Sequence, residues 1–246
     1  DLKTTPFSFG KVAQDAHAGD ATQGIGDVSL LRATGADDSY ILIATRAGDA
    51  GGVVTDSVDM QVFTTSGSLF ARAITRSKSG PSRSATFAVL GGTGTYSGYR
   101  GELTLSANGL GITAKLAAPS GGSKPLNWYE TTKTPTTVAI PGGSFLAAQG
   151  SMYSDAQQKK KLGDYFASQI TYDEIDGVTP IMTMLEQDFK TGTMIVTGIT
   201  LSAGTDVDSV VRPVIGGTGD TIGASGQVTS AQQAGGVWRK SARFWR

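Results

Sequence analysis

The amino-acid sequence predicts an all-β protein that contains two copies of one β-unit, and two observations carry this prediction. The pattern Gly-Gly-Thr-Gly-x-x-x-Gly-x-x-Gly occurs at residues 91–101 and again at residues 216–226, which is an offset of 125 residues in a chain of 246. In addition, short alternating or β-branched runs fill most of the chain. Their spacing is typical of a β-sandwich or a β-barrel.

The repeat is longer than the glycine pattern. Residues 67–101 align without gaps with residues 192–226, and the elements match as strand, polar turn, strand, glycine turn and strand. Upstream the likeness continues with a predicted slip of one residue, which pairs Gln61 with Gln187. A likeness of this length indicates duplication of a whole unit rather than a short-period solenoid.

The repeat divides the chain into two expected domains, residues 1–122 and 123–246. Residues 117–137 are expected to form the connection, because they contain a Gly-Gly pair, two prolines and clusters of threonine. Residues 154–165 are expected to form a short helix. The expected strands are residues 27–34, 39–46, 57–65, 68–75, 85–90, 102–107 and 111–117, then 143–150, 165–174, 180–189, 193–201, 209–215, 225–232 and 237–245.

The glycine pattern itself favours a sharply bent strand. Glycine takes positive backbone angles without steric cost, and small closed barrels need such bends at their corners. The alternative is a nucleotide-binding loop, but that fingerprint requires a helix directly after the glycines. Residues 102–107 and 227–232, which follow the two patterns, are strand-like, and a Walker lysine is missing.

Composition limits the classes of partner. The chain has 21 basic and 21 acidic residues, so no basic excess attracts it to nucleic acid or to an anionic membrane surface. No apolar run approaches the roughly 18 to 20 residues of a membrane span. We therefore expect a neutral or hydrophobic small-molecule partner, with no nucleic acid and no membrane. The first residue is Asp1 rather than Met, which favours a processed and exported chain over a cytoplasmic one.

Several kinds of catalytic site are excluded by residue counts. The chain has no cysteine and one histidine, so thiolate nucleophiles and multi-histidine zinc sites are absent. A Ser-His-Asp triad would have to use His17, which lies in a Gly/Ala/Asp-rich stretch that we interpret as a loop with a solvated histidine. We expect no metal and no cofactor.

The segments around the glycine pattern resemble the allene oxide cyclase and dirigent barrel superfamily. The resemblance rests on residues 87–101 and 211–226, with Tyr96 where that family has an aromatic residue and Thr221 as a departure in the second copy. It implies an eight-stranded, antiparallel, up-and-down barrel of the calycin-like kind with an apolar cavity. This chain is then two tandem barrels. Plant members form trimers, and the fusion of two barrels leaves a homo-oligomer as an open expectation.

The resemblance further implies a cofactor-free cyclase or isomerase that steers stereoselective ring closure of a hydrophobic intermediate in natural-product biosynthesis. A four-plus-two cycloaddition is one candidate reaction. Holding the reacting ends close together in a dry cavity supplies much of such catalysis. The alternatives are a non-catalytic hydrophobic ligand carrier, or a structural barrel filled by side chains.

Polar residues that face inward from the strands are the candidate catalytic groups, and the second copy is the one we expect to be active. Glu186 shares a strand face with two methionines, so it either lies in the apolar lining or marks the solvent end of its strand. Tyr165 either donates a hydrogen bond to a carbonyl or packs in the core with its hydroxyl at the barrel rim. In the first copy, Arg72 either anchors an anion or enolate or lies on an outer face, and Asp59 shares a face with Gln61.

Overall fold

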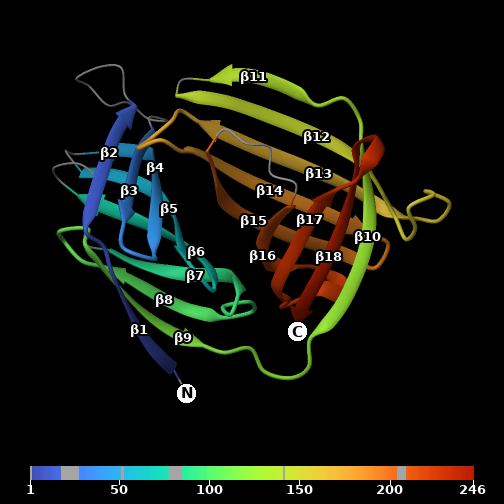
Figure 1. The fold of residues 1–246 in the computed structure, drawn as a ribbon, viewed down its shortest axis with the longest axis horizontal. Coiled ribbons are helices and arrows are strands. Elements are labelled where there is room, and N and C mark those ends of the chain that lie inside the picture. The colour runs from blue at the N-terminus through green and yellow to red at the C-terminus, as the bar shows by residue number, and fades with distance from the viewer. Residues whose placement is uncertain (1, 18–27, 51–52, 78–84, 141, 204–208) are drawn as a thin grey trace.

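The computed structural model describes residues 2–17, 28–50, 53–77, 85–140, 142–203 and 209–246, and it contains two antiparallel sheets (Figure 1). The sheets are consecutive in the chain and are joined by residues 118–123. The strands of the first sheet are β1 (Leu2–Ser8), β2 (Lys11–His17), β3 (Val28–Thr34), β4 (Ser39–Ala50), β5 (Val53–Thr64), β6 (Gly67–Ser77), β7 (Ala85–Gly94), β8 (Arg100–Leu105) and β9 (Gly111–Ala117). Those of the second are β10 (Lys124–Thr132), β11 (Thr136–Ile140), β12 (Gly143–Tyr153), β13 (Lys161–Tyr172), β14 (Thr179–Phe189), β15 (Gly192–Ser202), β16 (Ser209–Gly217), β17 (Ser225–Gln232) and β18 (Val237–Trp245).

The two sheets share one topology but only the second is closed. The first has the order β1-β9-β8-β7-β6-β5-β4-β3-β2, and within the described residues its edge strands β1 and β2 each have one neighbour. The second has the order β10-β18-β17-β16-β15-β14-β13-β12-β11, and β10 also pairs with β12. That pairing closes eight strands into a barrel and leaves β11 outside. The all-β fold of tandem up-and-down units is therefore confirmed, with the first unit a curled half-barrel.

Three apolar clusters hold the sheets. The first fills the inner face of the curled sheet and draws side chains from eight of its nine strands, including the fully buried Tyr40 and Phe87. The second fills one end of the closed barrel around Trp128, Met194 and Phe244. The third joins the outer faces of the two sheets and is formed by Leu30, Ile41, Ile43, Phe70, Tyr172, Ile175 and Ile199.

The glycine pattern forms the same turn in both copies. Gly94 has a φ of 58° and Gly219, 125 residues later, has a φ of 55°. A Cβ on Gly94 would lie 2.1 Å from the carbonyl oxygen of Ser66, and a Cβ on Gly219 would lie 2.0 Å from that of Thr191. Only glycine fits at these two points, because another residue would be strained and would also collide with backbone.

Hydrogen bonds repeat with the same offset. The Ser68 N–H donates to Oγ1 of Thr93 at 3.1 Å, and the Thr193 N–H donates to Oγ1 of Thr218 at 3.0 Å. The threonine of each Gly-Gly-Thr-Gly therefore binds the neighbouring strand. No α-helix follows either turn: the first leads into β8, and the second passes through a single 3-10 turn at Gly219–Thr221 into β17. The bent-strand interpretation of the glycines is thus correct.

The strand register corrects one prediction about the repeat. Thr64 lies opposite Gly67 across β5 and β6, and Phe189 lies opposite Gly192 across β14 and β15. The offset of 125 residues therefore continues upstream without the predicted slip. As a result, Gln61 corresponds to Glu186 rather than to Gln187.

The connection and the region of His17 were predicted wrongly. Residues 11–17 form β2 rather than a loop, with His17 opposite Val28, while residues 18–27 lie outside the described part of the chain. Most of the expected connection is strand: β10 pairs with β18 along its length and completes the barrel. The glycines, prolines and threonines suggested a linker, but this strand also carries Trp128 and Glu130, which are buried inside the barrel.

The short helix expected at residues 154–165 is also absent. Residues 154–160 form a hairpin turn in which the Asp155 carboxylate accepts the backbone N–H groups of Lys159 and Lys160 at 3.2 and 3.1 Å. From Lys161 onward the chain is β13, which pairs with both β12 and β14. Pairing on two sides outweighs the local preference of the lysine run for a helix.

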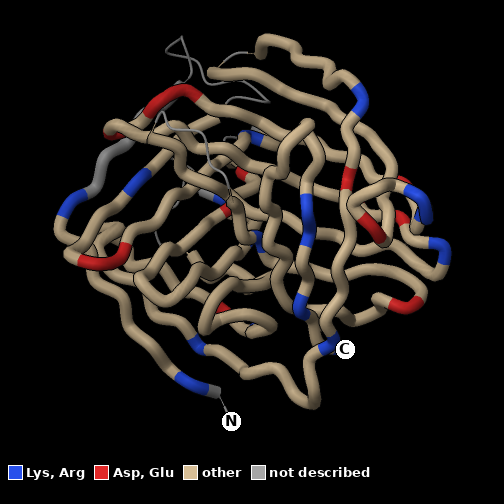
Figure 2. The backbone as a smooth tube through the Cα atoms, turned by 45° about the vertical axis from the view of Figure 1, so that its right-hand side comes forward, with Lys and Arg blue, Asp and Glu red and all other residues tan. Residues whose placement is uncertain are grey.

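Charged residues are dispersed over the backbone of both sheets in the view of Figure 2 rather than gathered in one stripe. Within the described residues, no helix is long and apolar enough to cross a membrane.

The glycine turn generates a stability prediction. Gly219→Ala places a Cβ against the Thr191 carbonyl at a positive φ, so we expect it to lower the free energy of unfolding by about 2 kcal/mol or more. Gly122→Ala is the matched control, since nothing lies within 4 Å of a Cβ there, and it should change stability by less than about 0.5 kcal/mol. Urea denaturation followed by circular dichroism measures both, and equal effects would contradict the role given to the turn.

Candidate functional site

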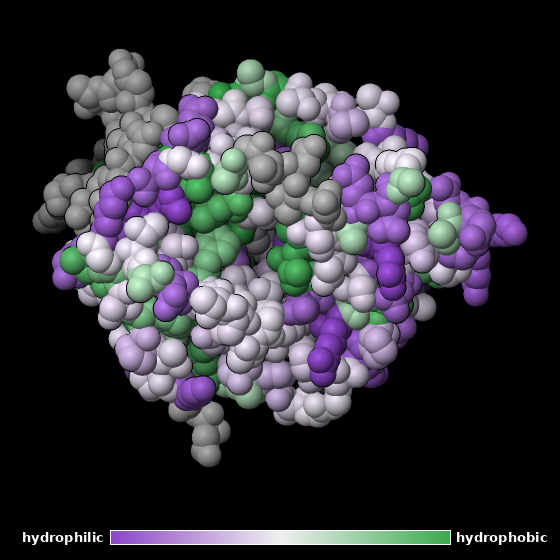
Figure 3. All heavy atoms as spheres, viewed as in Figure 1, coloured by the Kyte–Doolittle hydropathy of each residue, from purple (hydrophilic) through white to green (hydrophobic). Residues whose placement is uncertain are grey.

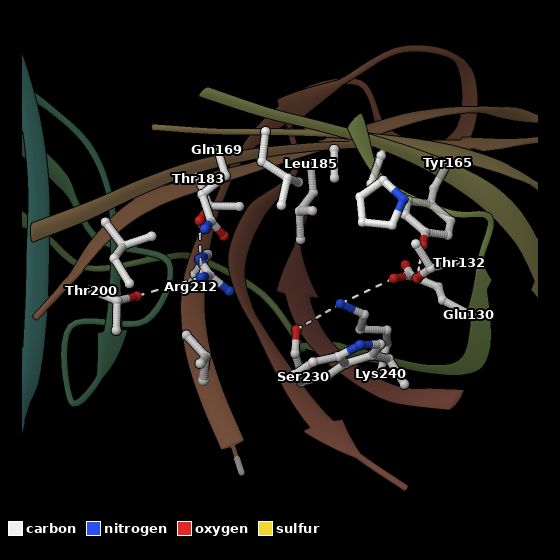
Figure 4. Close-up of a pocket in the computed structure, with 17 residues that line it drawn as sticks. Glu130, Thr132, Tyr165, Gln169, Thr183, Leu185, Thr200, Arg212, Ser230 and Lys240 are labelled. Carbon is white, nitrogen blue, oxygen red and sulfur yellow. Dashed lines mark hydrogen bonds and ion pairs between the residues drawn. The ribbon is translucent and has the colours of Figure 1, made fainter. Parts of the chain in front are cut away.

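A cavity of about 310 Å³ lies inside the closed barrel, at the end that the apolar cluster around Trp128 does not fill. Its middle is lined by aliphatic side chains, among them Leu146, Ala148 and Leu185. Its two ends are polar: Figure 4 shows Arg212 and Thr200 at one end and the group of Glu130, Tyr165 and Lys240 at the other. A small, largely apolar pocket with a few placed polar groups is the usual form of a small-molecule site.

A buried ion pair occupies one end. Lys240 Nζ on β18 lies 3.0 Å from Glu130 Oε2 on β10, and the two side chains are 6% and 2% exposed. Lys240 also donates to Ser230 Oγ at 2.9 Å. The other oxygen of Glu130 accepts from Trp128 Nε1 at 2.8 Å and from Gln187 Nε2 at 3.3 Å. Burial lowers the pKa of Lys240, while the neighbouring Glu130 carboxylate acts in the opposite direction.

A tyrosine hydroxyl lies beside the pair. The Tyr165 hydroxyl on β13 shares a short hydrogen bond with the Thr132 hydroxyl on β10. Burial raises the pKa of Tyr165, so the phenol keeps its proton at neutral pH. When Thr132 donates the shared hydrogen bond, the Tyr165 proton is left for an oxygen in the cavity.

At the opposite end, Arg212 is a cation without a carboxylate. Its Nη2 donates to Oγ1 of Thr183 at 3.0 Å and to Oγ1 of Thr200 at 3.5 Å. Its Nε is buried and has no hydrogen-bond partner, and Arg212 makes no ion pair with any described residue. Burial lowers the pKa of Arg212 to about 10. Two cations and one carboxylate thus leave the cavity with one positive charge that no group of its described lining balances.

The polar lining is specific to the second copy. Five inner positions that are apolar and buried in the first sheet are polar in the barrel, as the common register shows. The pairs are Val58 and Thr183, Val62 and Gln187, Phe87 and Arg212, Leu105 and Ser230, and Ile112 and Lys240. One tyrosine position is shared, because Tyr40 corresponds to Tyr165. Polar side chains of the second unit therefore stand where apolar side chains fill the first, and four of the five, Thr183, Arg212, Ser230 and Lys240, line the cavity.

The structure brings one of the four predicted site residues, Tyr165, into the cavity. Glu186 is exposed on the outer face of β14, because Thr183, Leu185 and Gln187 take the inner face. The interpretation of Glu186 as part of an apolar lining is therefore wrong. The carboxylate inside the barrel is Glu130, which the sequence pattern places in the expected connection.

Asp59 and Arg72 form an ion pair and neither residue lines the cavity. They lie opposite each other on β5 and β6, on the outer face of the first sheet, with Arg72 Nε 2.6 Å from Asp59 Oδ1 and Nη2 3.0 Å from Oδ2. The pair lies at the contact with the barrel. Burial, together with the Asp59 charge, raises the pKa of Tyr172 there to about 12. Arg72 thus binds a carboxylate of its own chain.

No protein-family model and no curated protein sequence matches this chain. Among solved structures, this chain is similar to a pyocyanin demethylase at 13% sequence identity and a TM-score of 0.42, over 49% of this chain and 99% of that one.

The buried ion pair generates a second prediction. Lys240→Met leaves the Glu130 carboxylate buried without a cation, which should cost about 3 to 5 kcal/mol of folding stability. Adding Glu130→Gln removes that uncompensated charge and keeps a hydrogen-bond acceptor for Trp128, so the double variant should recover most of the loss. Denaturant unfolding of both variants checks this, and a double variant no more stable than the single one would show that the two groups do not compensate each other.

Proposed function

We propose that the closed barrel is a cofactor-free cyclase or isomerase that acts on a small, mainly apolar molecule carrying a carbonyl, enolate or carboxylate oxygen. The observation that carries the proposal is Arg212, a desolvated cation at the end of an apolar cavity that has no carboxylate partner among the described residues. The likeness of the glycine segments to allene oxide cyclase and dirigent barrels supports ring closure as the reaction.

The size and lining of the cavity favour a small ligand. A volume of about 310 Å³ lies at the low end of the range for small-molecule sites. Leu146, Ala148, Ala167 and Leu185 contact the body of such a ligand and exclude water from it. Exclusion of water strengthens the electrostatic interactions of the polar groups at the two ends.

Arg212 selects an oxygen on the ligand. A buried N–H group without a partner costs free energy, and an acceptor oxygen at Nε would remove that cost. If negative charge develops on this oxygen during the reaction, as in enolate formation, the guanidinium stabilises the transition state more than the ground state. Lys240 and Tyr165 lie at the other end, where one of them passes a proton to the ligand or orients it.

Ring closure or isomerisation needs no further component. A pericyclic closure exchanges no atoms with solvent, and an isomerisation returns to one carbon the proton that is removed from another. The barrel contributes by holding the reacting ends together in one conformation. The product therefore has the mass of the substrate, and this equality of mass identifies the reaction even in a mixture of many compounds.

A non-catalytic carrier is the alternative, and one observation favours it: Glu130 and Lys240 satisfy each other and do not require a ligand. A carrier would hold its ligand unchanged, so the identity of the products separates the two functions.

The test is untargeted mass spectrometry of a metabolite extract incubated with the protein. We expect a compound to be replaced by a product of equal mass and different retention time. Leu185→Trp fills the cavity and should abolish the conversion, whereas Met184→Trp, one residue away on the exposed outer face, should not. A compound that copurifies with the protein but is never converted would show a carrier, and conversion that survives Leu185→Trp would place the activity elsewhere.

A second test addresses Arg212 with two dyes of the same aromatic body. Anilinonaphthalene sulfonate carries an anion and phenylnaphthylamine does not. Arg212→Gln should weaken binding of the sulfonate by about tenfold or more, the loss of one charged hydrogen bond, and should leave the neutral dye nearly unaffected. Fluorescence titration measures both, and equal changes for the two dyes would argue against an oxygen-binding role of Arg212.

A further inference from the structure

A groove of about 240 Å³ lies outside the barrel, where the barrel meets the first sheet. Figure 3 shows the surface hollowed between the two sheets. The first sheet contributes Gln61, Ser68 and Thr93 to this groove, and the barrel contributes Val211. Two further residues, Thr200 and Val210, line both the groove and the barrel cavity. The two spaces are therefore separated at this point only by the wall between β15 and β16.

That wall is split. β15 and β16 pair only at Met194, Ile195 and Val196, where the ladder contains a bulge, and residues 197–202 have no partner among the described residues of β16. On its other side, β15 pairs with β14 up to Ser202. The split therefore lies in the barrel wall itself, beside Thr200.

The first sheet reaches the edge that the split exposes. The backbone N–H of Ile199 donates to Oε1 of Gln61 at 3.1 Å, a position that a continuous ladder would give to β16. Gln61 in turn donates to Ser68 Oγ at 2.7 Å, and Ser68 Oγ lies 2.9 Å from Thr93 Oγ1. This chain of an amide and two hydroxyl groups forms a polar, uncharged lining on the outer side of the split.

We propose that the groove is a second subsite, continuous with the barrel cavity through the split, and that it holds the neutral polar end of the same ligand. This inference rests on the proposed function. The ligand then has three parts: an apolar body beside Leu185, an oxygen acceptor at Arg212, and a hydroxyl- or amide-bearing end beside Ser68 and Thr93. An uncharged end fits best, because none of the described residues that line the groove is charged.

Arg212 lies at the junction of the two spaces, since its Nη2 approaches Thr200, which lines both. An ester or amide carbonyl at this point would have the apolar chain on one side and the polar substituent on the other. The first sheet thereby contributes to ligand specificity although its own interior is filled.

The experiment uses two esters with the same octanoyl chain and carbonyl, methyl octanoate and octanoyl glycerol, measured by displacement of phenylnaphthylamine. Octanoyl glycerol should bind about tenfold more tightly, the gain expected from its hydroxyl groups in the groove. Val211→Trp fills the groove from an exposed position and should remove this difference while leaving the affinity for methyl octanoate unchanged. Val138→Trp is the matched control, an exposed valine on β11 that lines neither space, and it should keep the difference.

Each outcome decides a separate point. Equal affinities for the two esters, or equal weakening of both by Val211→Trp, would overturn the second subsite and leave the barrel cavity as proposed. Failure of both esters to displace the dye would overturn the three-part acyl ligand and the subsite with it, whereas the proposed function is decided separately by the mass-spectrometric test.

Discussion

The tight passage of a glycine past a neighbouring carbonyl oxygen, at Gly94 and again at Gly219, is the constraint on which the rest of the structure depends. It fixes where β7 and β16 end and how the chain returns. Next to it, a bulge interrupts the ladder at the same point of each copy, between Phe70 and Ala71 and between Ile195 and Val196. A bulge bends a strand and increases its twist, and in both copies the two strands pair only over a short stretch beyond the turn.

The same region joins the two units. A Cβ on Gly91 would lie 2.7 Å from Cβ of Pro213, so β7 approaches β16 as closely as it does only because this residue is glycine. Arg100 crosses the contact and donates to the carbonyl oxygens of Leu90 and Ala224, the latter at 3.2 Å. The glycine segment thus shapes each unit and also provides the surface by which the units meet. The split beside β16 faces the first sheet for this reason.

The two units share one strand order but differ in the side chains of their interiors. In the first unit Phe87 and other buried apolar side chains fill the space, and each contributes on the order of 2 kcal/mol of burial. In the second unit the corresponding Arg212, with Lys240 and Glu130, takes charge out of water at a cost that only good pairing offsets. Groups that lower stability inside a barrel are typical of functional sites. The filled unit therefore buries mainly apolar side chains, whereas the barrel holds the buried charged groups around its cavity.

The sequence by itself determined the features that local chemistry encodes: the all-β class, the duplication, most strand positions and the two glycine turns, because positive φ angles and two-residue alternation are visible in a single segment. Lys240 shares a strand face with Ala242 and Phe244, and this alternation is the signal in the sequence that could have indicated an inward lysine. Tertiary structure alone decided the rest. Neighbouring residues of a strand point to opposite faces, so an error of one residue in the expected register exchanges the inner and the outer face. For this reason only the structure shows that Glu186 lies outside the barrel and Gln187 inside it. Closure of the barrel by β10, which buries Glu130, depends on pairing with distant strands that no local pattern specifies.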